Sequence, residues 1–399
     1  MSEKSVSILL VGIGGYGSTY INGLLDNRCD EKYHIAGAVD PNPEGQPRLA
    51  ELKALNIPVY GTMEEFYNRQ TADLAVISSP IHFHCEQACY ALSKGSNVLC
   101  EKPLCATEEE GLKMTETSKK TGKFLSVGYQ WSHSEAIQSL KKDIQSGLFG
   151  KALRFKTILL LPRTDKYYSR GWAGKLRDSE GRWILDSIAN NATAHYIHNM
   201  FYLLGKNTNG SAKPLYVTAE LYRANPIESF DTAAMRAETV EGVELLYLAT
   251  HASKEHLGPV FDYEFEKGKV IFRNSADPNK RNIIAYFNDG NTKVYGDPNK
   301  GTLNKLWTAI DMVNNAGELI CGPEAAFSHI LCIKGMHESN EITPFPEHII
   351  KRVEKMVGEE SGIYAEGLSE ILKTCYENWS LPSELGIPWA KPGKRIRIN

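Results

Sequence analysis

The sequence predicts an α/β protein with two domains, and three observations support this fold class. The chain has 399 residues, which is more than a domain with a single hydrophobic core usually has. Over residues 1–130, short apolar strand patterns alternate with helix patterns, which indicates a parallel sheet with helices on both faces. Residues 131–399 contain long runs of β-forming residues, which predict an α/β domain with a large, mainly antiparallel open sheet.

The first domain is expected to contain six strands joined by helices. The strands are predicted at residues 7–11, 33–39, 57–60, 74–78, 97–100 and 124–129. The helices are predicted from a glycine-rich turn to residue 26, and over 62–69, 83–94 and 107–122. Capping boxes mark two of these helices, because Thr62 precedes Glu65, and Thr107 precedes Glu110, at the required spacing.

The second domain is expected to open with a helix over 135–146 and a long strand over 152–161. Further strands are predicted at 215–222, 232–239, 243–250, 260–265, 269–272 and 282–286. Further helices are predicted at 192–204, 303–314, 325–334, 348–356 and 364–377.

Composition and charge argue against several classes of protein. The formal net charge is −3 without a concentrated basic region, so nucleic-acid binding is not expected, and the short basic stretch 391–397 is interpreted as a solvated tail or an edge strand. The apolar run at 8–11 is too short for a signal peptide, and no stretch approaches the length of a membrane span. The eight cysteines form no C-x-x-C pair, which favours reduced thiols. We therefore expect a cytoplasmic protein that acts on a soluble small molecule, away from membranes.

A glycine-rich turn follows the first predicted strand and opens a helix. It fits the pattern G-x-G-x-x-G and consists of Gly12, Ile13, Gly14, Gly15, Tyr16 and Gly17. In a dinucleotide-binding Rossmann domain, these glycines allow the tight turn, the approach of the pyrophosphate and close packing of helix on strand. Asp40 ends the second predicted strand, where its carboxylate can accept hydrogen bonds from a ribose and would repel a 2′-phosphate. The pattern predicts NAD as the cofactor, with NADP less favoured.

A second motif, Glu101-Lys102-Pro103, follows the fifth predicted strand. Ligands of open α/β sheets bind at the carboxyl ends of the strands, so Lys102 is expected to point into the crevice beside the glycine-rich turn. The alternative interpretation is an ordinary solvated lysine in a loop.

With these motifs the sequence resembles the glucose–fructose oxidoreductase/inositol dehydrogenase/MocA (Gfo/Idh/MocA) family. The resemblance covers residues 7–151 and includes Ser79-Pro80-Ile81-His82-Phe83-His84, Gly128-Tyr129-Gln130 and Ser146-Gly147-Leu148-Phe149-Gly150. It implies cofactor contacts from Ser79, Pro80, His84, Glu101, Lys102 and Gln130. It also implies a second domain whose open sheet makes oligomer contacts, as in a homodimer or homotetramer.

The resemblance further implies an acid/base histidine in a D-x-G-x-H element, for which two registers compete. Matching the aspartate to Asp186 places Asn190 in the histidine position, whereas matching the downstream spacing places His195 there and Asn191 in the aspartate position. We favour the second register, in which Asn191, His195 and His198 share one stripe of a helix and Asp186 reaches the site from before it. His195 would take the hydroxyl proton of a substrate, and the Lys102 ammonium would stabilise the charge on the oxygen. A buried structural role for His195, or a zinc site with His198 and Asp186, is the alternative, and we expect no metal.

Substrate contacts are expected from the loop after strand 152–161. This loop is rich in aromatic and cationic residues, which suit sugar rings and anionic groups: Arg163, Tyr167, Tyr168, Arg170 and Trp172. Asn191 and His195 are expected to contact the substrate as well. Weaker candidates are Ser229, Asp231, Thr250 and His251, of which His251 is expected to be a buried sheet residue.

Three functions remain open from the sequence. The first is an NAD(P)-dependent dehydrogenase or reductase that acts on a secondary alcohol of a sugar, a sugar derivative or a cyclitol. The second is an enzyme that uses tightly bound NAD for transient oxidation, as in epimerisation or glycosidase-like elimination. The third is a sensor that binds NAD without catalysis, against which the motif at Lys102 and the presence of His195 argue.

Overall fold

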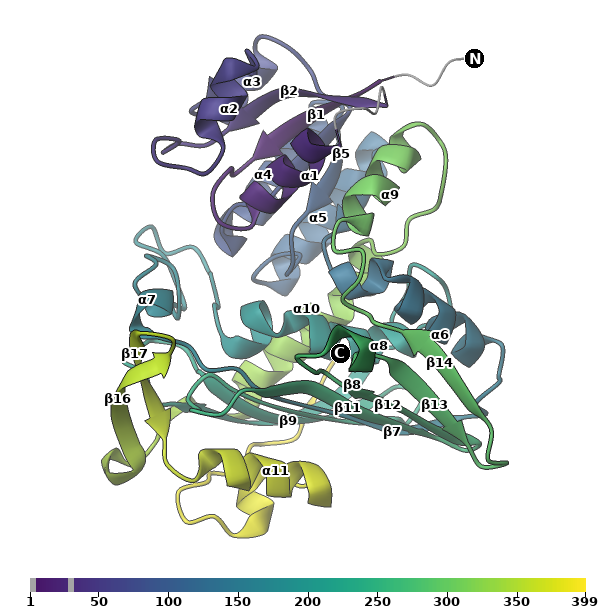
Figure 1. Ribbon diagram of the computed structural model, residues 1–399, viewed down its shortest axis with the longest axis vertical. Coiled ribbons are helices and arrows are strands. Elements are labelled where there is room, and N and C mark those ends of the chain that lie inside the picture. Colours follow the sequence, from purple (N-terminus) through teal and green to yellow (C-terminus); the bar gives the residue numbers. More distant parts are fainter. Residues whose placement is uncertain (1–4, 28–31) are drawn as a thin grey trace. The chain divides into compact units, whose positions relative to one another are not determined.

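The computed structural model describes residues 5–27 and 32–399, and it divides into two compact units (Figure 1). The first unit comprises Met1–His133 and Gly301–Phe327, and the second comprises Ser134–Lys300 and Ser328–Asn399. The boundary expected near residue 130 lies close to the end of the first of these segments. Segment 301–327, which the sequence pattern assigned to the second domain, instead belongs to the first unit.

The first unit contains a six-stranded parallel sheet, as the sequence predicted. Its strands are β1 (Val6–Val11), β2 (Tyr33–Val39), β3 (Val59–Tyr60), β4 (Leu74–Ile77), β5 (Asn97–Cys100) and β6 (Leu125–Val127). The strand order is β3-β2-β1-β4-β5-β6, so the order reverses between β1 and β4. In a sheet of this kind, the reversal opens a crevice at the carboxyl ends of the strands, where dinucleotides bind.

Helices connect these strands and cover the sheet. They are α1 (Gly17–Asp26), α2 (Leu49–Ala54), α3 (Met63–Tyr67), α4 (Ile81–Ser93), α5 (Glu108–Thr121) and a short 3-10 turn η1 (Gln130–His133). Thr107 forms the predicted capping box with Glu110. The box predicted at Thr62 is only half formed: the Thr62 hydroxyl accepts the N–H of Glu65, but the Glu65 carboxylate accepts the N–H of Gly61. Helix α2 was not predicted, because its six residues are too few to show helical periodicity.

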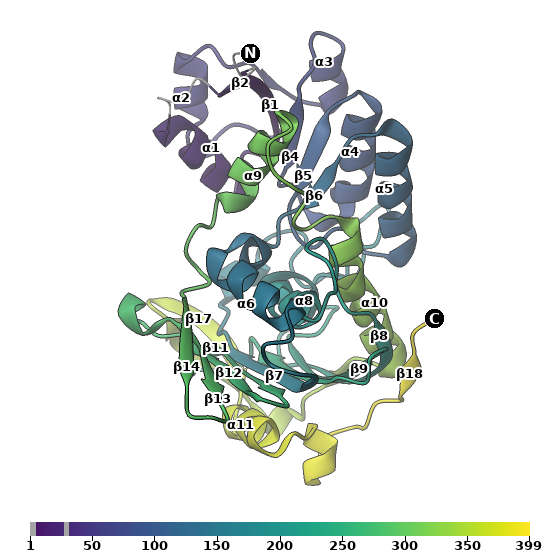
Figure 2. The ribbon, with the colours of Figure 1, turned by 90° about the vertical axis from the view of Figure 1, so that its right-hand side faces the viewer.

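The returning segment adds helix α9 (Asn304–Val313) to the first unit. Figure 2 shows α9 beside α1 on one face of the sheet, with α4 and α5 on the opposite face. Leu306 and Ile310 of α9 are buried in one cluster with Tyr20 and Leu24 of α1. Tertiary packing therefore decides which unit contains this helix, because the helical pattern of 303–314 fits either core equally well.

The second unit contains the large open sheet, which is mainly antiparallel. Its strands are β7 (Ala152–Leu160), β8 (Pro214–Arg223), β9 (Thr232–Thr239), β10 (Glu244–Thr250), β11 (Leu257–Phe265), β12 (Gly268–Arg273), β13 (Ile283–Phe287), β14 (Thr292–Gly296), β15 (Thr343–Pro344) and β18 (Ile396–Arg397). The order is β14-β13-β12-β11-β7-β10-β9-β8-β15, and β18 also pairs with β8. Only the pairs β7–β10 and β8–β15 are parallel among those described. The basic stretch at 391–397 thus ends in an edge strand.

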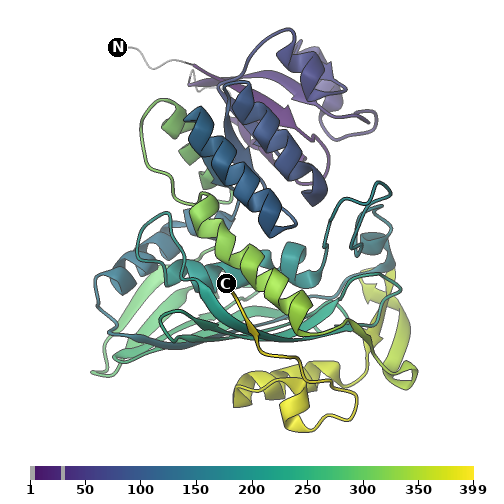
Figure 3. The ribbon, with the colours of Figure 1, turned by 180° about the vertical axis from the view of Figure 1, so that it is seen from behind.

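Helices lie on both faces of this sheet. They are α6 (Glu135–Gln145), α7 (Asp165–Tyr168), α8 (Ala194–Leu203), α10 (Pro323–Ser339) and α11 (Leu368–Asn378). Figure 3 shows α10 crossing one face and α11 on the other. Leu372 and Tyr376 of α11 are buried against Ile158 of β7 and Leu246 of β10. None of the helices described is long and apolar enough to cross a lipid bilayer.

The helix expected at 348–356 is wrong, because this segment forms strand β16 (Ile350–Val357). It pairs in a hairpin with β17 (Glu360–Ala365), so the helix expected from residue 364 begins only at Leu368. Ile350, Val353 and Val357 recur at a spacing that also fits a helix face. The turn at Gly358, with a φ of +59°, and the pairing with β17 decide in favour of the strand.

Replacing Leu306 by alanine is expected to lower the free energy of unfolding of the first unit by about 2–5 kcal/mol, because the leucine is fully buried. Urea denaturation followed by circular dichroism measures this change. Leu112→Ala is the control, since Leu112 on α5 is 55% exposed and should change the free energy by less than about 0.5 kcal/mol. Equal small effects of the two substitutions would show that α9 is not part of this core.

Candidate functional site

The glycine-rich turn connects the carboxyl end of β1 to α1 as the sequence predicted. The N–H of Gly12 donates to Val39 O at 2.8 Å, which holds the start of the turn against β2. Gly12 has a φ of +82°, and a Cβ on Gly17 would overlap the carbonyl oxygen of Gly12. The close approach of α1 to β1 therefore depends on these two glycines.

The start of α1 has the features of an anion-binding helix terminus. No side chain caps it, and its first turn contains no acidic residue. The N–H of Gly17 already donates to Gly14 O and that of Thr19 donates to Tyr16 O, each at 2.9 Å, so the helix dipole is the main feature that favours a negative group there. Together with the glycine backbone of Gly14 and Gly15, this arrangement fits a dinucleotide pyrophosphate.

Asp40 lies directly after β2 and is largely buried. One carboxylate oxygen accepts the N–H of Ile13 at 3.1 Å, and the other accepts the N–H of Asn42 at 2.9 Å. The carboxylate is thus fixed against the glycine-rich turn, at the end of the strand where the ribose of a bound dinucleotide is expected.

The predicted cofactor residues after β4 and β5 are joined by His84. Pro80 is the N-cap of α4, and the Ser79 hydroxyl donates to Gln87 Oε1 at 2.5 Å. The buried His84 ring contacts Ser79 O and Pro103 O, each at 2.9 Å. Burial lowers the pKa of His84, and its two carbonyl contacts offset part of this effect. His84 therefore braces the two loops, because both of its ring nitrogens already face backbone carbonyls.

Glu101 of the second motif is buried and has partners from three parts of the first unit. Tyr20 OH donates to Glu101 Oε1 at 2.5 Å, the backbone N–H of Lys102 donates to Oε2 at 3.2 Å, and the Lys305 ammonium forms an ion pair with Oε1. Sequence reasoning missed Lys305. Its only local signal was a lysine within the apolar helix pattern of 303–314.

Gln130 opens η1, where it accepts a hydrogen bond from Tyr16 OH at 3.3 Å. This contact connects the glycine-rich turn to the segment after β6. Predicted cofactor residues of four loops thus lie along the carboxyl edge of one sheet.

In the second unit, Asp186 and Asn191 are brought together. Asp186 is buried, its Oδ2 accepts the N–H of Gly174 at 2.6 Å, and its Oδ1 accepts Asn191 Nδ2 at 2.8 Å. Asn190 is buried too, and its side-chain amide donates to Leu185 O at 3.1 Å. Asn190 therefore faces the backbone, whereas the half-exposed His195 of α8 offers the more accessible polar side chain.

The single helical stripe expected for Asn191, His195 and His198 is wrong in part. A π turn, η2 (Ile188–Ala192), contains Asn191, and α8 begins only at Ala194. Thr193 separates the two elements with a φ of −120°, and its hydroxyl donates to Ile188 O at 2.5 Å. Only His195 and the buried His198 share α8.

The loop after β7 gathers the predicted substrate residues around aromatic rings. The Arg163 guanidinium lies 4.6 Å from the Tyr167 ring centre, and Arg170 lies 4.0 Å from Tyr167 and 4.7 Å from Trp172. Tyr168 follows with its ring 5.1 Å from that of Tyr167. These cation–π contacts hold both guanidinium groups within one loop.

His251, a weaker candidate, is buried after β10 as expected. Its Nδ1 lies 2.8 Å from Leu161 O and must donate, because a carbonyl only accepts. Burial, assisted by the positive charge of Arg163, lowers the pKa of His251 to about 3. The ring is therefore neutral at pH 7 and presents Nε2 as an acceptor.

The remaining weak candidates, Ser229, Asp231 and Thr250, are buried near the ends of β9 and β10. Asp231 is fully buried and accepts the N–H groups of Ala224 and Asn225. Thr250 Oγ1 lies 2.7 Å from Thr232 Oγ1. Ser229, two residues before Asp231 in the sequence, is buried as well. In the described part of the chain, no three His, Cys, Asp or Glu side chains gather as metal ligands would.

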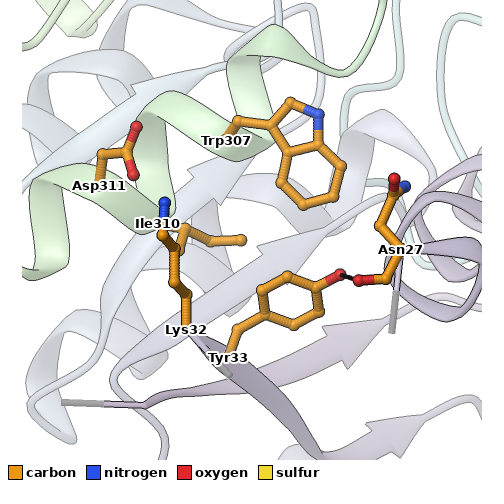
Figure 4. Close-up of a pocket in the computed structure, with 6 residues that line it drawn as sticks. All are labelled: Asn27, Lys32, Tyr33, Trp307, Ile310 and Asp311. Carbon is orange, nitrogen blue, oxygen red and sulfur yellow. Dashed lines mark hydrogen bonds between the residues drawn. The ribbon is translucent and has the colours of Figure 1, made fainter. Parts of the chain in front are cut away.

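A hollow of about 300 Å³ in the first unit lies away from the predicted cofactor residues (Figure 4). Its lining residues are Asn27, Lys32, Tyr33, Trp307, Ile310 and Asp311. Tyr33 is the first residue of β2, so the hollow lies at the amino end of this strand, opposite the edge that the glycine-rich turn occupies. Tyr33 OH lies 3.1 Å from both Leu24 O and Asn27 O, which share its single hydrogen.

Comparison with known proteins identifies the first unit. The family model of the Gfo/Idh/MocA proteins, an oxidoreductase family with an NAD-binding Rossmann fold, matches residues 6–129. The chain is 27% identical over 186 residues to 1-carboxy-3-chloro-3,4-dihydroxycyclohexa-1,5-diene dehydrogenase of Comamonas testosteroni, which covers 45% of this chain and 46% of that protein. It is 26% identical over 169 residues to inositol 2-dehydrogenase of Corynebacterium glutamicum, covering 42% and 49%. The chain spans about half the length of the curated relatives it matches.

The fold of both units has counterparts among solved structures. The WlbA dehydrogenase of Bordetella pertussis, solved in complex with NADH and UDP-GlcNAcA, superimposes with a TM-score of 0.69 at 19% identity. The superposition covers 84% of this chain and 96% of that chain. Residues 6–129 thus match the NAD-binding Rossmann fold of the Gfo/Idh/MocA oxidoreductases, and the fold of most of the chain is similar to that of the WlbA dehydrogenase.

Proposed function

We propose that this protein is an NAD-dependent dehydrogenase or reductase for a secondary alcohol of a sugar, a sugar derivative or a cyclitol. One observation carries the proposal: Lys102 follows β5 at the same carboxyl edge as the glycine-rich turn, and a hydrogen bond from Tyr20 of α1 to Glu101 joins the two motifs. The family is an oxidoreductase family, and matched relatives are named dehydrogenases of cyclic polyols.

In this proposal, bound NAD supplies the acceptor for the hydride of the alcohol carbon. Lys102 stabilises the developing negative charge on the alcohol oxygen through its ammonium group. His195 accepts the hydroxyl proton, for which an imidazole is suited near neutral pH. Asp186 is the third proposed catalytic residue, and its hydrogen bond to Asn191 fixes the orientation of that amide.

The proposed substrate contacts fit a polyhydroxylated ligand. Arg163, Tyr168 and Trp172 belong to a loop whose guanidinium groups and aromatic rings already contact each other, so they offer donors beside flat apolar faces. Asn191 and His195 complete the set proposed from the sequence. We also propose a homodimer or homotetramer, on the family resemblance, and a cytoplasmic location, on the scattered cysteines without a C-x-x-C pair.

Lys102→Ala is expected to retain NADH binding but to lose at least about 100-fold in the rate of NAD reduction, because the group that stabilises charge on the alcohol oxygen is removed. The assay follows absorbance with inositols, aldoses, sugar acids and a nucleotide sugar acid, and NADH binding is followed by fluorescence. Lys119→Ala on the exposed face of α5 is the control and should leave both quantities unchanged.

Two results of this assay would redirect the proposal. Product formation without accumulation of NADH, together with NAD retained through purification, would favour transient oxidation, as in a hydratase or epimerase. NADH binding without turnover of any substrate, unaffected by Lys102→Ala, would favour a sensor.

Asp40→Asn is expected to reduce the preference for NADH over NADPH by about tenfold, which corresponds to ~1.4 kcal/mol, because the amide removes the negative charge that repels a 2′-phosphate. Fluorescence titration with each cofactor gives the two dissociation constants. Glu64→Gln, at an exposed position of α3, is the matched control for loss of a carboxylate. An unchanged ratio in Asp40→Asn would contradict the assignment of Asp40 to the ribose.

A further inference from the structure

Lys305 is a fully buried lysine whose ammonium group lies among the cofactor-binding loops of the first unit. It forms an ion pair with Glu101 and donates to Gly128 O at 3.1 Å. It also lies 4.4 Å from the ring centre of Tyr16, in the glycine-rich turn. One cation thus contacts the turn after β1, the motif after β5 and the segment after β6.

The residues around the Glu101 carboxylate hold it in one position. A Cβ on Gly128 would lie 2.8 Å from Glu101 Oε1, so a side chain at this position would push the carboxylate away from the segment after β6. Tyr20 OH donates to the same oxygen of Glu101 that pairs with Lys305, and Oε2 accepts the backbone N–H of Lys102. Glu101 therefore connects the buried ammonium directly to the backbone of the proposed catalytic lysine.

Charge explains why this buried lysine is needed. A buried carboxylate without a counter-charge is strongly unfavourable, and Glu101 has cations on two residues, Lys305 and the adjacent Lys102. Burial tends to raise the pKa of Glu101, but the Lys305 ammonium and its hydrogen bond lower it, so the net direction is downward. Lys102 contributes less than Lys305 to this lowering. The Lys305 ammonium of α9 is thus the main group that keeps Glu101 ionised.

We infer that Lys305 is a positioning residue that neutralises Glu101, so that the Lys102 ammonium acts on the substrate oxygen and is not needed to balance Glu101. The inference rests on the proposed function of Lys102. With Lys305 present, the Glu101 carboxylate has two neighbouring lysines, and the ammonium of Lys305 is the one that pairs with it directly. Without Lys305, Lys102 becomes the sole cation beside a buried carboxylate.

Other titratable groups surround this pair. They are Tyr16 and Tyr20 from the turn and α1, His84 from α4, Cys100 from β5, and Tyr129 and His133 after β6. Burial raises the pKa of Tyr16, Tyr20 and Cys100, so these groups are neutral at pH 7. Burial and the charge of Lys305 lower the pKa of His133 to about 3. The Glu101, Lys102 and Lys305 charges therefore dominate the local electrostatics.

The test measures the pKa of Lys102 directly, from the pH dependence of its acetylation by acetic anhydride, resolved by peptide mass spectrometry. Lys305→Met is expected to raise this pKa by about one unit or more, because an opposite charge beside a cation favours the charged form. Glu101→Gln is expected to lower it. The double variant, Glu101→Gln with Lys305→Met, should return it to near the wild-type value, because both charges of the pair are absent.

The pH profile of kcat gives a second test, because a purely structural role of Lys305 would not shift this profile. In Lys305→Met, kcat should fall at least about tenfold and the basic limb of its pH profile should move upward with the pKa of Lys102. The double variant should recover most of the rate. The matched control, Lys300→Met, removes an exposed lysine five residues earlier and should change neither readout.

The outcomes separate this inference from the proposed function. An unchanged pKa of Lys102 in both Lys305→Met and Glu101→Gln would overturn the inference, whatever the enzyme's activity. If Lys305→Met does not fold, Glu101→Gln and the double variant still decide the matter, since the inference requires a lower pKa in the first and a near-normal pKa in the second. Failure of the wild-type protein to bind NADH would instead refute the proposed function.

Discussion

The ion pair between Glu101 and Lys305 is the interaction on which the arrangement of the first unit depends. Burying a carboxylate is favourable only when a counter-charge and hydrogen bonds accompany it. Here the counter-charge comes from α9, and the hydrogen bonds come from Tyr20 and the backbone of Lys102. A sheet formed by the N-terminal segment alone would leave Glu101 buried without its cation. The predicted catalytic motif therefore requires two segments of chain that are far apart in the sequence.

Much of the fold could be predicted because local residues determine it. The six parallel strands, the capping box at Thr107 and the glycine-rich turn each depend on residues within one short segment. Two errors have a common physical origin, which is that long-range contacts chose between locally equivalent alternatives. The apolar spacing of 350–357 fits a helix face, but pairing with β17 makes it a strand. The apolar face of α9 fits either core, but it packs on α1.

The predicted site residues divide in a similar way. The glycine-rich turn could be located because the strand end, the turn and the helix start follow one another in the sequence, and Asp40 could be located because it ends the next strand. The single stripe expected for Asn191 and His195 failed because the Thr193 hydroxyl bonds back to Ile188 and interrupts the helix between them. Lys305 could not be found from spacing at all, because its partner lies 204 positions earlier in the chain. Its role becomes visible only when the two segments meet.

The divided first unit has a consequence for the order in which the protein is made. A ribosome releases the strands β1 to β6 first, but it releases α9 only after all of the second unit up to Lys300 has been synthesised. During that interval the nascent N-terminal sheet has its glycine-rich turn but lacks both the apolar cover of α9 and the counter-ion of Glu101. The first unit, whose synthesis begins first, thus completes its core late. Contacts between segments as far apart in the sequence as α1 and α9 form slowly.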